Sequence, residues 1–203
     1  IKIGGPAGPA HDLARIVASH EFAKSVLFHS HQVNLHALDA IVRGIQGGST
    51  LRGFAEVSNQ MRNWTRELHA AVSALTELSA QQVHLFSDFV KKRRLITLLT
   101  AADGGGDESA ALRASVGRQA AELEAAALEL KRLRRRVRNA LEDLVQLGLM
   151  ARVLSSAAMI ESMAGDTEQR SELMHVSKGF AERSEQIADL IRLMLRNDKE
   201  LSA

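Results

Sequence analysis

Apolar residues recur at seven-residue intervals along much of this 203-residue chain. The clearest row comprises Phe54, Met61, Leu68, Leu75, Gln82 and Phe89, and the intermediate positions hold Val57, Trp64, Ala71, Leu78 and Leu85. Two interleaved rows of this kind form a coiled-coil seam, in which the side chains of one helix insert between those of another. The segment therefore predicts a helix of about five heptads that packs against partner helices.

Three further segments show helical periodicity. One carries the rows Val116, Leu123, Leu130, Val137, Leu144, Ala151, Ala158 and Ala126, Leu133, Ala140, Leu147, Leu154. Another carries Leu173, Val176, Phe180, Ile187, Ile191 and Met194. The first segment of the chain is less regular, and its predicted core face holds Leu13, Ile16, Leu27, Leu38, Ile41 and Ile45. Together these patterns predict four helices of about 35, 50, 55 and 35 residues in chain order.

Breaks between these segments are short and rich in glycine. They are Gly47-Gly48-Ser49-Thr50, Asp103-Gly104-Gly105-Gly106-Asp107 and Ala164-Gly165-Asp166-Thr167. Glycine commonly follows a helix C-terminus, and short connections place consecutive helices antiparallel. Aromatic residues make up only 3% of the chain, which disfavours strands. The sequence predicts an all-α, elongated antiparallel four-helix bundle, a coiled coil of two helical hairpins whose turns share one end.

The domain organisation follows from these breaks. Residues 1–10, Ile1-Lys2-Ile3-Gly4-Gly5-Pro6-Ala7-Gly8-Pro9-Ala10, lack helical periodicity and are interpreted as a flexible leader or as a remnant of an expression tag. Residues 11–203 are predicted to be a single bundle, with hairpin one at 11–100, a linker at 101–107 and hairpin two at 108–203.

Two decapeptides of the chain resemble each other. Arg52-Gly53-Phe54-Ala55-Glu56-Val57-Ser58-Asn59-Gln60-Met61 shares Gly, Phe, Ala, Glu, Ser and Gln, at identical spacing, with Lys178-Gly179-Phe180-Ala181-Glu182-Arg183-Ser184-Glu185-Gln186-Ile187. The repeat indicates an internal duplication of a helix–turn–helix hairpin. Chance similarity between heptad sequences is the alternative.

The stretch around the first turn resembles the cytoplasmic signalling hairpin of methyl-accepting chemotaxis receptors. The similar residues are Asn34-Leu35, Ala37-Leu38, Ala40, the turn glycine Gly48, Arg52-Gly53-Phe54-Ala55 and Val57, with a weaker match at Ser156-Ala157-Ala158-Met159 and Ala164-Gly165-Asp166. Glutamates of the family's tip are replaced by Arg43 and Ser49. In that family, two chains pair their hairpins into a four-helix bundle whose tip binds a histidine kinase and a coupling protein.

The resemblance implies a non-enzymatic, cytoplasmic signal-transduction or scaffolding protein that presents its glycine turns to a protein partner such as a histidine kinase or coupling protein. The residues expected to contact the partner are Arg52, Phe54, Glu56, Gly179, Phe180 and Glu182. Phe54 and Phe180 also lie on heptad rows, so a core role is the alternative for them. The oligomeric state stays open, a homo-oligomer included.

Other constellations in the sequence are weaker. The chain has no cysteine and no recognisable catalytic motif, so neither an enzyme nor a cofactor is expected. No apolar run reaches the ~20 residues of a membrane span. His20, His29, His31 and His36 leave a small-ligand or metal sensor as one alternative, and a structural spacer is another. Basic runs at 91–94 and 131–138 predict either a solvated face or an anion-binding patch. A net charge of only +2 and the absence of interleaved aromatic residues argue against nucleic acid.

Overall fold

The computed structural model describes residues 9–101, 109–164 and 167–202, and within these ranges the chain forms four long α-helices and no strand. They are α1 (Pro9–Gln46), α2 (Arg52–Ala101), α3 (Ser109–Glu161) and α4 (Thr167–Ser202), of 38, 50, 53 and 36 residues. The predicted all-α fold is confirmed, and so are the predicted helix lengths to within a few residues.

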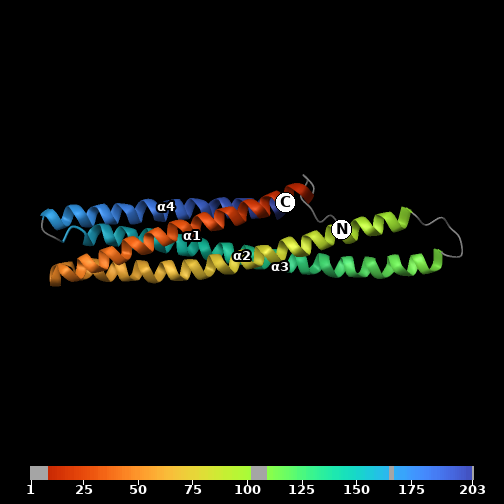
Figure 1. Cartoon of the computed structure of the whole chain (residues 1–203), viewed down its shortest axis with the longest axis horizontal. Helices are drawn as coiled ribbons and strands as arrows, with labels where there is room; N and C mark the ends of the chain where they lie inside the picture. The colour runs from red at the N-terminus through yellow and green to blue at the C-terminus, as the bar shows by residue number, and fades with distance from the viewer. Residues whose placement is uncertain (1–8, 102–108, 165–166, 203) are drawn as a thin grey trace.

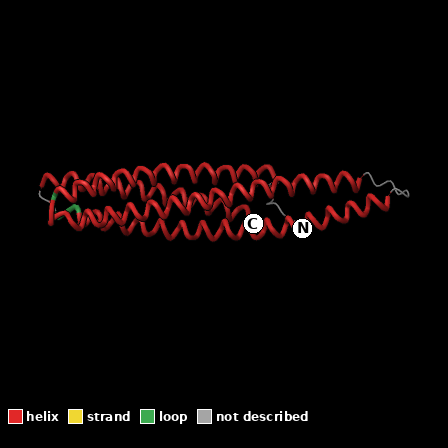
Figure 2. The backbone as a smooth tube through the Cα atoms, turned by 60° about the horizontal axis from the view of Figure 1, so that its bottom comes forward, coloured by secondary structure: helices red, strands yellow, loops and turns green. Residues whose placement is uncertain are grey.

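The helices pack in a closed ring, because α1 contacts α2, α2 contacts α3, α3 contacts α4, and α4 contacts α1. Helices α1 and α3 are therefore diagonal to each other, as are α2 and α4. Both hairpin turns lie at one end of an elongated rod, as the sequence predicts (Figures 1 and 2). At the first turn a short 3₁₀-helix, η1 (Gly48–Leu51), joins α1 to α2, and Gly48 has a φ of +67°, a conformation that favours glycine.

The heptad row of α2 is buried as predicted, and every member from Phe54 to Phe89 is at most 5% exposed. The intermediate row is only half-buried, apart from Trp64. The residue that follows each member of this row is buried instead: Ser58, Thr65, Val72, Ser79 and Phe86. A helix that touches two neighbours buries a wider stripe than a two-stranded coiled coil does. Buried hydroxyls donate to carbonyls one turn earlier, Ser58 to Phe54 at 2.8 Å and Ser79 to Leu75 at 2.9 Å.

The predicted core face of α1 is largely wrong. Ile16 is buried, but Leu27 and Ile41 are half-buried, Leu38 is 36% exposed and Ile45 is 70% exposed, while the side chain of Leu13 lies outside those described. The core face is built mainly from small residues: Ala23, Val26, Ser30, Val33, Ala37, Ala40 and Gly44. A Cβ atom at Gly44 would lie 2.6 Å from that of Ala55. Helices α1 and α2 thus approach too closely near the turn for larger side chains.

Burial in the second hairpin repeats that of the first in register. Along α1 and α3, Ala23, Val26, Val33, Ala37, Ala40 and Gly44 correspond at one constant offset to Leu141, Leu144, Ala151, Ser155, Ala158 and Ser162, all buried. Along η1, α2 and α4, Leu51, Phe54, Ser58, Met61, Thr65, Leu68 and Val72 correspond to Ser177, Phe180, Ser184, Ile187, Ile191, Met194 and Asp198, again all buried. The second correspondence is the one given by the two similar decapeptides, so the buried positions support a duplicated hairpin.

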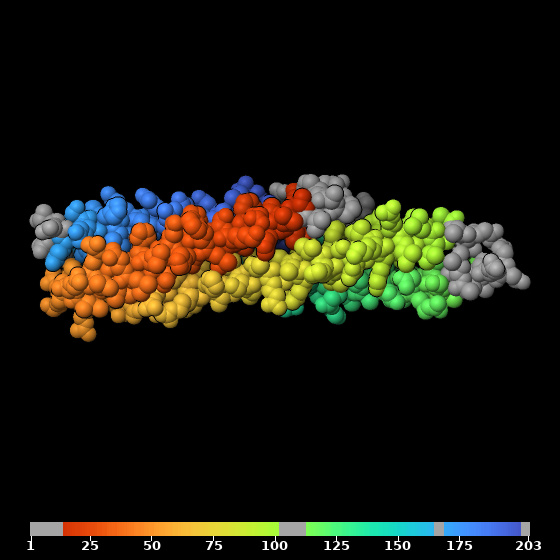
Figure 3. All heavy atoms as spheres, in the orientation of Figure 1, coloured from red at the N-terminus to blue at the C-terminus, as the bar shows by residue number. Residues whose placement is uncertain are grey.

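Helices α2 and α3 continue beyond the other two as a two-helix arm, which we define as residues 90–101 and 109–126 (Figures 1 and 3). No side chain described in the arm is fully buried, and its seam consists of half-buried residues such as Ile96, Leu99, Val116 and Leu123. The four-helix bundle therefore holds nearly all of the core, and the arm depends on a single seam.

The bounds of the predicted segments shift slightly. Pro9 and Ala10, assigned to the leader, begin α1, and residues 1–8 lie outside the described residues. Of the predicted linker 101–107, only Ala101 is described, as the last residue of α2. Helix α3 passes the length and hydropathy test for a membrane span over Arg113–Glu161, with a mean hydropathy of 1.3 in its most apolar window. Core helices of soluble bundles pass the same test, so the expectation of no span stays a prediction.

Candidate functional site

The structure separates the six residues predicted to contact a partner. Phe54 and Phe180 are 0% exposed and pack in the core, which is the alternative role that their heptad positions suggested. Arg52, Glu56 and Glu182 are exposed, and Gly179 is half-buried. A Cβ atom added at Gly179 would lie 3.8 Å from Nε2 of His36 in α1, so this glycine faces the neighbouring helix.

These exposed charges do not form one patch. Arg52 and Glu56 follow one face of α2, whereas Glu182 lies on α4, and these two helices occupy diagonal corners of the bundle. A single partner that binds one side of the rod therefore cannot contact all three.

Two rows of exposed apolar side chains at the turn end were missed by the sequence reasoning. The α1 row consists of Leu35, Leu38, Val42 and Ile45. The α3 row consists of Leu149, Val153 and Ile160, together with Met163 in the turn just after α3. Ile45 and Ile160 are each 70% exposed and Val153 is 69% exposed. The signal was present as apolar residues at helical spacing, but for Leu38 and Ile45 it was assigned to the core.

The two apolar rows lie at corresponding positions of the two hairpins. Leu35, Val42 and Ile45 occupy the α1 positions that correspond to Val153 and Ile160 in α3 and to Met163 in the turn after it. Because α1 and α3 are diagonal, the turn end presents similar apolar faces on opposite sides. Contiguous exposed apolar surface is a mark of interaction sites in proteins.

Ion pairs and close contacts join the two hairpins near the turns. Arg43 at the end of α1 forms an ion pair with Glu172 of α4 and another, at 2.9 Å, with Asp39. Both carboxylates raise the pKa of the Arg43 guanidinium, Asp39 more than Glu172. Across the other interface, Gly53 of α2 lies so close to Glu161 of α3 that a Cβ atom would be 2.0 Å from its carboxylate. The ends of the two hairpins therefore form one joint surface.

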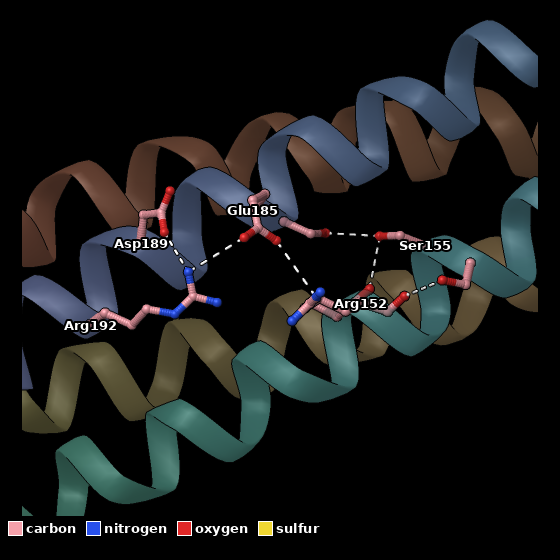
Figure 4. Close-up of polar contacts among 8 residues, drawn as sticks. Arg152, Ser155, Glu185, Asp189 and Arg192 are labelled. Carbon is pink, nitrogen blue, oxygen red and sulfur yellow. Dashed lines mark hydrogen bonds and ion pairs between the residues drawn. The ribbon is translucent and has the colours of Figure 1, made fainter.

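A shallow groove between α3 and α4 runs beside the α3 row. Its base holds Ser155 and Ser184, whose hydroxyl oxygens are 3.0 Å apart, and Met159 and Ile160 line the side nearer the turn. Arg152 of α3 reaches Glu185 of α4 at 3.6 Å, and Arg192 lies between Glu185 at 3.4 Å and Asp189 at 2.5 Å (Figure 4). The groove thus has small side chains at its base, an apolar part toward the turn and a charged part away from it.

The histidines of α1 do not assemble a metal site in the described part of the chain, where no three His, Cys, Asp or Glu side chains lie close enough to share an ion. His31 is exposed, and His29 stacks edge-on against Phe28 with ring centroids 5.5 Å apart. Burial lowers the pKa of His29, and the positive charge of Arg183 lowers it further. The Nδ1 atom of His29 is buried without a hydrogen-bond partner. The environment of His29 therefore favours a neutral imidazole.

No protein-family model matches the chain. A search of curated proteins likewise finds no significant match.

Proposed function

We propose that this protein is a non-enzymatic signalling or scaffolding bundle that docks a protein partner at its turn end. The observation that carries the proposal is the pair of equivalent apolar rows, on α1 and α3, at the end where both turns lie. The sequence resemblance to chemoreceptor hairpins concerns the same end, and in that family it is the end that binds partners.

The shape of the molecule agrees with such a role. A rod that carries two rows of exposed apolar side chains near one end can present them at a distance from its other end. A helix of 50 residues such as α2 spans about 75 Å at 1.5 Å per residue. The partner class supported by the resemblance is a coupling protein or a histidine kinase, and the location that goes with it is the cytoplasm.

The proposal is tested by direct binding of the purified chain to the coupling protein and the chemotaxis-type histidine kinase of the source organism. Val42→Glu combined with Ile160→Glu introduces one charge into each apolar row at exposed positions, where glutamate is a good helix former. We expect at least a tenfold loss of affinity, because central apolar contacts carry most of the energy of an interface.

The matched control is Leu95→Glu combined with Leu98→Glu, which places the same two charges at exposed leucines of the arm. It should bind the partner as the unmodified chain does. Failure of the unmodified chain to bind either protein, or equal losses in the two double variants, would contradict the proposal and favour a structural spacer.

A further inference from the structure

The arm and the adjoining part of α3 concentrate the positive charge of the molecule. The exposed basic residues there are Lys91, Arg93, Arg94, Arg113, Arg118, Lys131, Arg132, Arg135 and Arg136. The chain as a whole carries a net charge of only +2, so this concentration leaves the remainder acidic on balance. A local field of this kind attracts anionic partners even when the total charge is small.

Ion pairing within the protein neutralises only part of this charge. Lys91 pairs with Asp88 at 3.6 Å, Lys92 with Glu122 at 2.8 Å and Arg132 with Glu129 at 3.4 Å. Within the described residues, no ion pair or hydrogen bond involves the side chain of Arg93, Arg94, Lys131, Arg135 or Arg136. In the same stretch of α3, Arg138 pairs with Asp198 of α4 at 3.1 Å. The solvated-face interpretation therefore accounts for part of the basic side chains and leaves the five unpaired ones available.

Leucines lie exposed among these charges. Leu95 is 44% exposed and Leu98 is 60% exposed, and their spacing places them on the same face of α2 as Lys91 and Arg94. Leu128 on α3 is 51% exposed, one turn before Arg132. Lysine and arginine beside exposed leucine is the pattern of a helix at a lipid interface, where the cations meet headgroups and the apolar side chains enter the acyl boundary.

We propose that the arm binds the surface of an anionic lipid bilayer, with the basic residues on the headgroups and Leu95 and Leu98 inserted. A lipid surface would contact both the basic and the apolar side chains of the arm. The phosphate backbone of a nucleic acid would contact the basic side chains alone and leave the leucines in water. The aromatic residues nearest the arm, Phe86 and Phe89, are buried, so the stacking contacts of single-strand binding are missing there.

The first test is sedimentation of the full-length chain with vesicles of phosphatidylglycerol and phosphatidylcholine, against vesicles of phosphatidylcholine alone. Binding is expected only to the anionic vesicles and should weaken with added salt. Each basic residue near such a surface contributes about a fivefold change in affinity. Arg93→Gln combined with Arg94→Gln should therefore weaken binding about 25-fold.

The control removes two arginines from the opposite half of the same helix, by Arg62→Gln combined with Arg66→Gln. This variant should bind the anionic vesicles as the unmodified chain does. Equal binding to both kinds of vesicle, or equal losses in the two variants, would overturn the proposal.

Insertion is tested separately by tryptophan fluorescence. Leu98→Trp should give a blue-shifted emission when anionic vesicles are added, because the indole leaves water. The chain's own tryptophan, Trp64, is 1% exposed in the bundle core and supplies a constant background. Ile45→Trp, at the turn end, should not shift. An unshifted Leu98→Trp spectrum on bound protein would overturn the proposal, and so would displacement of the chain from vesicles by low concentrations of duplex DNA.

Discussion

The two interfaces between the hairpins occupy equivalent places in the bundle but differ in chemistry. At the α2–α3 interface, Trp64 donates from Nε1 to the carbonyl of Leu147 at 2.8 Å. The corresponding positions at the α1–α4 interface are Leu190 for Trp64 and His29 for Leu147. Val57, packed against the core on α2, has Arg183 as its counterpart on α4. At these positions the α2–α3 interface is apolar and hydrogen-bonded, whereas the α1–α4 interface includes a histidine and an arginine.

This difference indicates which of the two interfaces between the hairpins is less stable. His29 Nδ1 and Gln32 Oε1, both in α1, are buried without partners, and each such atom costs about 1–3 kcal/mol. The α1–α4 interface is also shorter, because α2 and α3 have 50 and 53 residues whereas α1 and α4 have 38 and 36. We expect the rod to open first between α1 and α4.

The largest expected effect comes from removing the indole at the apolar interface. Trp64→Ala should lower the free energy of unfolding by about 3–5 kcal/mol, because a buried side chain and its hydrogen bond are both lost. Leu190→Ala, at the equivalent but half-buried position, should cost roughly 1–2 kcal/mol. Urea unfolding followed by circular dichroism at pH 7.5 measures both. A loss in Leu190→Ala as large as that in Trp64→Ala would mean that the interfaces are equally strong.

The next effect is a dependence of stability on pH at the polar interface. Burial and Arg183 lower the pKa of His29 below its ordinary value of 6.5, so the unfolded chain binds a proton more readily than the folded one. The stability that the neutral imidazole of His29 contributes is fully present above the pKa that this group has in the unfolded chain. It is lost as the pH falls from about 6.5 toward the folded pKa.

Replacing the imidazole isolates this contribution. His29→Leu, which copies Leu147, should reduce the fall in stability between pH 7.5 and pH 5 and raise stability at neutral pH by about 1 kcal/mol. His31→Leu is the matched control on the exposed side of α1 and should keep the pH dependence of the unmodified chain. The same pH slope in both variants would assign the titration to other groups.

The sequence predicted the parts of the fold that large apolar side chains determine. The heptad row from Phe54 to Phe89 was predicted to be buried and is buried, and rows of this kind also predicted the four helices. On α1 the rule failed, because close approach to α2 selected alanine, serine and glycine for the core and left Leu38 and Ile45 outside. The apolar rows of the turn end could not be separated from core residues by pattern alone. Their exposure depends on which neighbours each helix has, and heptads do not specify that.

The smallest expected effect compares Gly53 with Gly179, which occupy equivalent positions at the two interfaces. In α4, a Cβ atom at Gly179 would meet His36 only at an ordinary contact distance of 3.8 Å. Gly179→Ala should therefore stabilise the protein by about 0.5–1 kcal/mol through helix propensity. In α2, a Cβ atom at Gly53 would lie 2.0 Å from the carboxylate of Glu161, so the end of this side chain must move and Gly53→Ala should bring a smaller gain.

A double-mutant cycle shows whether Glu161 causes this difference. In a Glu161→Ala background the obstructing carboxylate is gone, and Gly53→Ala should then become more favourable than it is in the unmodified chain. The coupling between these two neighbouring positions is expected to be at least about 0.5 kcal/mol. If Gly53→Ala stabilises the unmodified chain as much as Gly179→Ala does, the α2–α3 interface is looser at the turn than the contact with Glu161 indicates. The contrast between the two interfaces would then be confined to the stretch around Trp64 and His29.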